Sequence, residues 1–197
     1  YLKKYFPNHF FSASMTMEIS NQKKLSEFYE ELKRLGINII RPDINKCNAD
    51  FSSDGKNFLY ALGAIKNVGF EAISKIVEER TKNGEYKDLA DFINRVNPKD
   101  INKLQLEGLV KAGAFDNLYS NRHSLYNSIP NIILKSKNIF ENNSVNQIDL
   151  FQEDNDETYL DIIEDWTVDV KLSKEFETLG FFISDHPVNQ YKSLFNQ

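Results

Sequence analysis

The sequence has little of several features that would give a chain a covalent framework or a membrane anchor. Its 197 residues include one cysteine, Cys47, so an internal disulfide is excluded and a reducing cytoplasm is the expected compartment. No apolar run approaches the roughly 20 residues that a membrane-spanning helix needs, so we expect no membrane partner. The opening, YLKKYFPNHF, lacks the zones of a signal peptide and is expected to continue a helix of a longer chain.

The sequence also lacks a catalytic constellation. His9, His123 and His186 are far apart and do not have metal-ligand spacing, and Cys47 has no neighbouring histidine. There is no glycine-rich nucleotide loop. The segment Pro42–Asn45 ends in asparagine where a pair of metal-binding aspartates would need a carboxylate. We therefore expect no catalytic residue, metal site or cofactor in this chain, and a metal- or thiol-dependent enzyme is the least favoured function.

The net charge of −5 is concentrated in one part of the sequence. Residues 136–169 carry 1 basic and 10 acidic side chains, whereas residues 56–135 carry 12 basic and 9 acidic ones. The acidic total is therefore compatible with local phosphate contacts in the mildly basic middle of the chain. It argues against a chain that coats DNA non-specifically.

Apolar periodicity predicts a mainly α-helical fold with a small β element near residues 37–61. Asp54-Gly55, between two short apolar runs, predicts a hairpin within this element. Helices are predicted over residues 22–35, 70–83, 86–96, 101–112 and 122 to about 140, the last interrupted or kinked near Pro130. Residues 141–169 are rich in Asn, Asp and Glu and predict a mobile acidic linker, with order returning at about Val170.

Two segments predict turns that bind phosphate. In Ile65–Gly69, a tight turn ending in glycine would point backbone N–H groups outward at the start of the next helix, where the helix dipole also favours an anion. A second unit spans Asn102–Asp116, with its turn at Lys111–Ala114. Lys66, Lys103 and Lys111 lie near these turns and suit phosphates as point charges. This pattern is typical of a tandem helix-hairpin-helix, although Gly69 and Gly113 could equally be ordinary helix ends and the lysines a solvated face.

The linker contains one apolar island, Gln147-Ile148-Asp149-Leu150-Phe151. An exposed Leu-Phe pair costs solubility unless it docks somewhere. A short peptide can place most of its binding energy in two or three such anchors, and Gln147 could add a directional hydrogen bond. The alternative is that Leu150 and Phe151 fold back onto the core of this chain.

Seven segments in order carry a resemblance to a known family. The sequence resembles the DNA polymerase III alpha subunit through YLKKYFP, RPDIN, ADF, LGAIKNVG, INKLQLEGLVKAGAFDNL, QIDLF and LGFFISDHP. The resemblance implies that residues 1–55 end a fingers domain and that residues 56–140 form a tandem helix-hairpin-helix region holding duplex DNA. It also implies that residues 141–169 are a linker carrying a clamp-binding motif. Residues 170–197 would then lead to an oligonucleotide-binding domain beyond this chain.

The same resemblance implies site residues and partners. DNA contacts map to Lys66, Asn67, Val68, Gly69, Lys103, Lys111 and Gly113, with Asn67 standing where the usual motif has glycine. Contacts with the beta sliding clamp map to Gln147, Asp149, Leu150 and Phe151. Double-stranded DNA, the clamp and other polymerase III holoenzyme subunits are the implied partners, and the catalytic aspartates and magnesium belong to a palm domain outside this chain. A helical protein-interaction module without DNA binding is the alternative.

Overall fold

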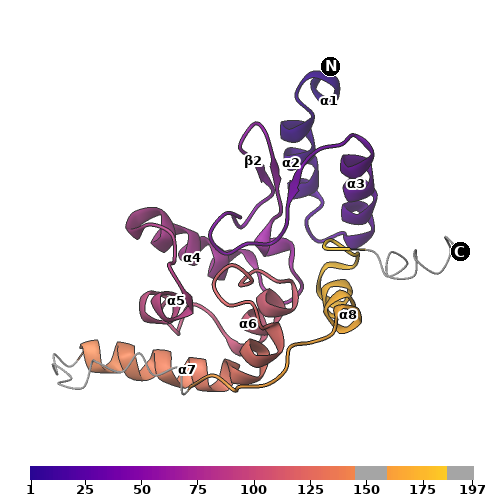
Figure 1. Cartoon of the computed structure of the whole chain (residues 1–197). Helices are drawn as coiled ribbons and strands as arrows, with labels where there is room; N and C mark the ends of the chain where they lie inside the picture. The colour runs from indigo at the N-terminus through magenta and orange to yellow at the C-terminus, as the bar shows by residue number, and fades with distance from the viewer. Residues whose placement is uncertain (145–158, 186–197) are drawn as a thin grey trace, which may run out of the picture.

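The computed structural model describes residues 1–144 and 159–185. Its elements are α1 (Leu2–Tyr5), α2 (Pro7–Met17), α3 (Gln22–Arg34), β1 (Ile39–Ile40), β2 (Ser52–Ser53), β3 (Phe58–Leu59), η1 (Leu62–Ala64), α4 (Phe70–Asn83), α5 (Leu89–Arg95), α6 (Lys103–Lys111), α7 (Arg122–Ser144) and α8 (Val168–Leu179). Figure 1 shows α1 to α3 at one end of the molecule and α7 along the opposite edge. The prediction of a mainly helical fold with a small β element is confirmed.

The amphipathic helix α3 forms as its periodicity predicts. Leu25, Tyr29 and Leu32, spaced three and four apart, are its buried residues. The Asn21 side chain accepts a hydrogen bond from the amide of Lys24 at 3.2 Å and caps the N-terminus. At the other end the chain leaves the helix through Gly36, at a φ of +68°. The helix therefore begins and ends where the sequence indicates.

The small sheet has the strand order β1-β3-β2. The strands β2 and β3 are antiparallel, with Ser53 opposite Phe58, and form the hairpin predicted at Asp54-Gly55. The Asp54 carboxylate accepts hydrogen bonds from the amides of Lys56 and Asn57, at 2.9 and 2.6 Å, which fixes the turn. The strand β1 joins the other side of β3 in parallel.

One core connects this sheet to the helices that follow it. Tyr60, Ile65, Ile73 and Leu109 belong to a single cluster of buried side chains, which also takes in residues of α2, α3 and α7. The helix α6 packs along α7, and α8 packs against α6. This arrangement brings the beginning of α4, the beginning of α6 and the end of α8 into one region of the molecule.

The helix α7 is longer than predicted. It continues through Pro130 to Ser144, so of the predicted interruption or kink near Pro130 the interruption is absent. A proline removes one helical hydrogen bond. Pro130 is exposed, however, and Ile129 and Ile132 on either side of it are buried, so core packing stabilises both halves as one helix.

The segment 159–167 packs along α7, so this part of the predicted linker has fixed partners. The amide of Asp161 donates to Ser128 Oγ at 2.7 Å, and Asn121 Nδ2 donates to the carbonyl of Ile163 at 2.7 Å. The Trp166 ring stacks on His123, with ring centroids 5.5 Å apart. Acidic composition alone therefore does not predict a linker here, because backbone groups of this segment bond to polar side chains of α7 and of Asn121, the residue before it.

Candidate nucleic-acid interface

The first predicted turn, residues 65–69, connects η1 to α4 and faces solvent. Lys66, Asn67 and Gly69 are exposed, whereas Val68 is fully buried and anchors the turn in the core. Asn67 adopts a φ of +67°, the left-handed conformation that glycine adopts at no cost and that asparagine tolerates better than most residues. The backbone of the turn is therefore retained even though asparagine replaces the usual glycine.

Only some of the amides in this turn can receive a ligand. The amide of Lys66 donates to the carbonyl of Thr178 at 3.0 Å, and that of Val68 donates to Ile65 at 3.1 Å. The amides of Asn67, Gly69 and Phe70 have no hydrogen-bond acceptor among the residues described. Gly69 is also the N-cap of α4 and brings no capping side chain. Open amides at the positive end of a helix dipole are a suitable site for an anion.

The helix α6 supports the turn from behind. Gln105 Nε2 donates to the carbonyl of Val68 at 2.7 Å. The Oε1 atom of the same side chain accepts from the amide of Asn102 at 2.8 Å, which completes a capping box at the start of α6. Gly108 allows a close approach, since a Cβ there would lie 2.9 Å from the carbonyl oxygen of Lys66. Gln105 therefore positions the turn, and the spacing Asn-x-x-Gln is the signal that could have identified it.

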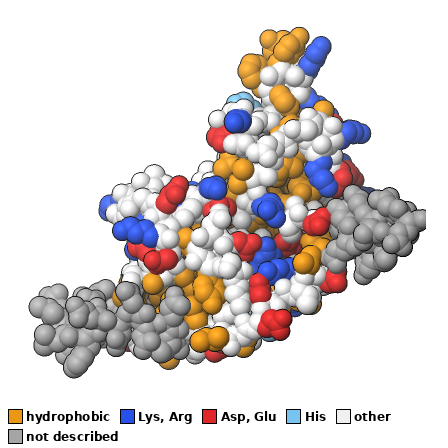
Figure 2. Space-filling model, in the orientation of Figure 1, with side chains coloured by type: hydrophobic (Ala, Val, Ile, Leu, Met, Phe, Trp, Pro, Cys, Tyr) orange, Lys and Arg blue, Asp and Glu red, His pale blue; other side chains and the backbone are white. Residues whose placement is uncertain are grey.

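The charge around the first turn is mixed. Lys66 is exposed and forms no ion pair within the described ranges. Lys103 is also exposed, and its Nζ lies 3.8 Å from a carboxylate oxygen of Glu107. Glu71, in the first turn of α4, places a negative charge close to the open amides. The site therefore offers directional amides and one free cation rather than a strongly basic surface, and Figure 2 shows acidic and basic side chains interspersed over the face in view.

The second predicted turn, after α6, is closed. Gly113 has a φ of +79° but is buried, and a Cβ added there would lie 2.2 Å from Nη2 of Arg122. The Arg122 guanidinium pairs with Asp116 through two hydrogen bonds of 2.8 and 2.6 Å. It also donates to the buried Glu175 at 3.0 Å. Arg122 therefore occupies the space above Gly113 that a phosphate would need.

Lys111, beside this second turn, already has a partner. Its side chain is 13% exposed, and its Nζ lies 2.8 Å from a carboxylate oxygen of Glu177 on α8. The hydrogen bond from Lys111 lowers the pKa of Glu177. Burial alone would lower the pKa of Lys111. The hydrogen bond to Glu177 has the opposite effect, and the pKa of Lys111 is raised overall. The charge of Lys111 is therefore already balanced by Glu177, and little of its side chain is exposed to a phosphate.

The remaining predicted residues fall into two groups. Gln147, Asp149, Leu150 and Phe151 lie outside the described residues. Cys47 is buried, and burial raises the pKa of its thiol to about 12, which favours the thiol over the nucleophilic thiolate at neutral pH. Over residues 1–144 and 159–185, no group of three or more His, Cys, Asp or Glu side chains could hold a metal ion, and no helix is long and apolar enough to cross a bilayer.

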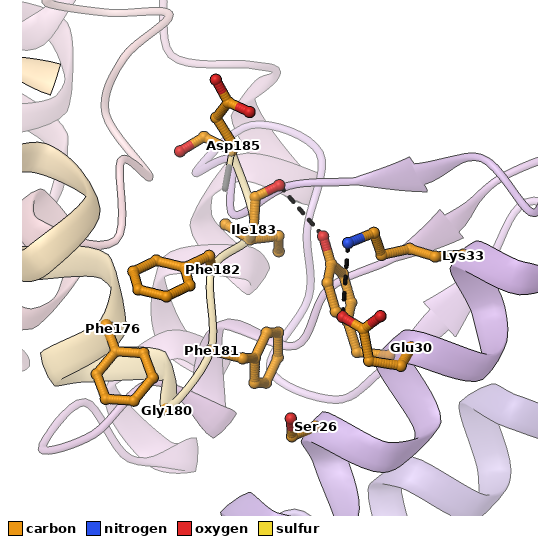
Figure 3. Close-up of a pocket in the computed structure, with 11 residues that line it drawn as sticks. Ser26, Glu30, Lys33, Phe176, Gly180, Phe181, Phe182, Ile183 and Asp185 are labelled. Atoms are coloured by element: carbon orange, nitrogen blue, oxygen red, sulfur yellow. Dashed lines mark hydrogen bonds and ion pairs between the residues drawn. The ribbon is translucent and has the colours of Figure 1, made fainter. Parts of the chain in front are cut away.

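A groove between α3 and residues 180–185 is a separate feature that the sequence did not indicate. Its volume is about 410 Å³, and Tyr29 and Phe181 stack in its wall with ring centroids 4.6 Å apart. Tyr29 Oη donates to the carbonyl of Ile183, and Phe176 and Phe182 lie together on the other side of the groove (Figure 3). Phe176 is 50% exposed. The groove therefore has a lining of aromatic and polar side chains that a partner could contact.

Comparison with known proteins agrees with the geometry of the first turn. A family model described as "Helix-hairpin-helix motif" matches residues 36–125, a range that includes both turns and the helices α4, α5 and α6. Residues 36–125 therefore place the chain in the class of proteins that contain a helix-hairpin-helix motif.

Curated relatives narrow this class. The chain is 36% identical over 190 residues to DNA polymerase III subunit alpha of Caulobacter vibrioides, and 37% identical over 202 residues to that of Borreliella burgdorferi. The matches cover 95% and 98% of this chain but 17% of each relative. The Campylobacter jejuni protein of the same name is 35% identical over the whole of this chain. The chain thus belongs to the DNA polymerase III alpha subunit family, and it spans about a sixth of the length of these relatives.

Proposed function

We propose that this chain contributes the grip on duplex DNA in a replicative DNA polymerase of the polymerase III alpha type. The observation that carries the proposal is the exposed turn at Lys66–Gly69, whose open amides lie at the N-terminus of α4. Backbone amides and one lysine recognise phosphate oxygens without reading bases, as a polymerase that copies every sequence requires. The family relationship supports a role in DNA replication.

The chain itself would carry no catalytic step. The parent enzyme would catalyse nucleotidyl transfer with magnesium held by carboxylates outside this chain. The turn would act on the product duplex and hold the polymerase near the primer end. We expect the isolated chain to show no nucleotide incorporation.

DNA binding is tested by its dependence on salt. A grip on about two to three phosphates gives a slope near −2 to −3 in a plot of log affinity against log salt concentration. Fluorescence anisotropy of a labelled duplex, titrated with the chain at several salt concentrations, measures this slope. Absent or salt-independent binding would contradict the proposal.

A second part of the proposal concerns processivity. Gln147, Asp149, Leu150 and Phe151 would bind the beta sliding clamp, and the acidic charge of residues 136–169 would keep this segment off DNA. Tethering to a clamp raises the effective concentration of polymerase at the primer end. Replacing both Leu150 and Phe151 by alanine should cost at least about 2 kcal/mol of clamp affinity, measured by titration calorimetry. Unchanged clamp affinity would refute this assignment.

The alternative is a protein-interaction module without DNA binding. The groove between α3 and residues 180–185 favours it, because Phe176 is half exposed at its edge. The two functions separate in one pair of variants. If the polymerase proposal holds, Lys66→Ala should weaken DNA binding; if the alternative holds, Lys66→Ala should have no effect on binding. Phe176→Ala should lower only the affinity for a protein partner.

A further inference from the structure

Two large apolar side chains are exposed beside the first turn. Phe70, the first residue of α4, directly follows Gly69 and is 52% exposed. Leu104, the second residue of α6, directly precedes Gln105 and is 59% exposed. The hydrogen bond from Gln105 to the Val68 carbonyl joins the start of α6 to the first turn. The backbone that carries Phe70 and the backbone that carries Leu104 are therefore held together by this one bond. Large apolar groups therefore occur on two different helices, one next to the open amides, at Phe70, and one next to the residue that supports the turn, at Leu104.

Neither folding nor helix formation accounts for Phe70. The buried residues of α4 are Ala72, Ile73 and Ile76, so its core face does not include the first position. An aromatic residue is a poorer helix former than most, and the N-terminal turn of a helix favours small polar or acidic residues. Exposing half of a phenylalanine in water also has a cost that burial elsewhere would relieve.

We infer that Phe70 of α4, together with Leu104 of α6, packs against the deoxyribose edge of the duplex whose phosphate the turn binds. This inference rests on the proposed function and names the part of the DNA that the site contacts. A phosphate accepting hydrogen bonds from the amides of Gly69 and Phe70 would lie about 3 Å from the backbone of Phe70. The sugars on either side of that phosphate are the carbon-rich surface within reach of the ring. The contact adds apolar burial to a site that has few free cations.

The inference separates two contributions to affinity that respond differently to salt. A lysine that neutralises a phosphate releases a counterion, so its removal lowers the salt slope by about 1. An apolar contact with a sugar releases no counterion. Phe70→Ala should therefore weaken duplex binding by about tenfold while the slope stays unchanged. Leu104→Ala should act in the same direction by a smaller factor.

The test uses the 197-residue chain, a labelled 20-base-pair duplex and the same strand alone, with affinity measured by anisotropy at four salt concentrations. The variants are Phe70→Ala, Phe70→Leu and Lys66→Ala. Phe176→Ala is the matched control, because Phe176 is 50% exposed but lies on α8 beside the groove. Phe70→Leu should keep most of the affinity, since a leucine still offers apolar surface, and Phe176→Ala should bind the duplex like the wild type. Thermal unfolding checks that each variant is folded, and Phe70→Gln replaces Phe70→Ala if that variant is not.

Each outcome has a distinct meaning. If Lys66→Ala lowers the slope while Phe70→Ala binds like the wild type, the inference is wrong and the proposed function stands. If Phe70→Ala weakens binding of the single strand more than binding of the duplex, the ring stacks on bases and the inference is also wrong. If the wild-type chain binds no duplex at all, the proposed function itself fails.

Discussion

The two hairpin turns of this chain share a glycine with the same positive φ but differ in the side chains that surround that glycine. Gly69 and Gly113 both have a φ of +79°, and both follow a lysine by two or three residues. The first glycine faces solvent as the N-cap of α4. The second lies beneath the guanidinium of Arg122, which is itself paired with Asp116 and Glu175.

This difference teaches that a glycine turn becomes a ligand site only when its surroundings leave it open. At the first turn, Gln105 bonds the carbonyl of Val68 from behind and leaves the outward amides unpaired. At the second, a side chain from α7 covers the turn, and Lys111 is paired with Glu177 on α8. We therefore expect the first turn to serve binding and the second to serve stability, and four predictions test this division.

The largest expected effect is on the ion pairs above the second turn. Arg122→Met leaves Glu175 buried without its cation, and breaking a buried pair costs about 3 to 5 kcal/mol. Urea denaturation should show this loss of unfolding free energy. Arg34→Met is the control, because Arg34 is exposed and its pair with Glu31 is solvated, so its loss should cost less than about 1 kcal/mol. Equal costs for the two variants would contradict a structural role for Arg122.

A smaller loss is expected when the glycine of the second turn is replaced. Gly113→Ala introduces a Cβ at a positive φ and against the Arg122 guanidinium, with a combined cost of about 2 to 3 kcal/mol. Gly84→Ala is the control, since Gly84 has a φ of +88° and nothing within 4 Å of the added Cβ. It should therefore show only the backbone cost, about 1 kcal/mol. The difference between the denaturation midpoints of the two variants measures the cost of the steric clash between the added Cβ and Arg122.

The third prediction concerns the lysines of the two turns. Lys66→Ala should weaken duplex binding about fivefold at low salt and lower the salt slope by about 1. Lys111→Ala should leave the slope unchanged, because Lys111 is already neutralised by Glu177. Anisotropy titrations of both variants against one duplex make the comparison direct. A lower slope for Lys111→Ala would show that the second turn also binds phosphate.

The smallest effect is a dependence of stability on pH at the second turn. The pKa of Glu177 is lowered from 4.5 by its bond with Lys111, so its stabilising contribution is present above pH 4.5. That contribution is lost as the pH falls through the lowered value. Glu177 is half exposed, and after screening by solvent the loss should stay below about 0.5 kcal/mol. The stability difference between wild type and Glu177→Gln should therefore vanish on acidification, and a difference that persisted at pH 2 would contradict this account.

The sequence predicted the local structure well because local rules decide it. The spacing of Leu25, Tyr29 and Leu32 predicted α3, and Asp54-Gly55 predicted the hairpin between β2 and β3. The exposed first turn also lies where the Ile65–Gly69 pattern places it. In each case the residues that determine the structure lie within a few positions of one another, where helix periodicity and turn chemistry act.

The parts that the sequence did not predict depend on distant partners. Arg122 reaches Glu175 across 53 positions, and Asn121 reaches Ile163 across 42. The parallel pairing of β1 with β3 likewise joins strands that do not follow one another in the chain. No periodicity encodes such contacts, and so neither the closure of the second turn nor the packing of residues 159–167 on α7 could be anticipated.

The position of α8 has one more consequence. Near its C-terminus the carbonyl of Thr178 accepts a hydrogen bond from the amide of Lys66. One turn earlier, the Glu175 carboxylate accepts a hydrogen bond from Arg122, which lies over Gly113. Because the single helix α8 is hydrogen-bonded to both hairpins, it fixes the distance between them. A force applied to the polypeptide after Gly180 would thus be delivered to both hairpins at once.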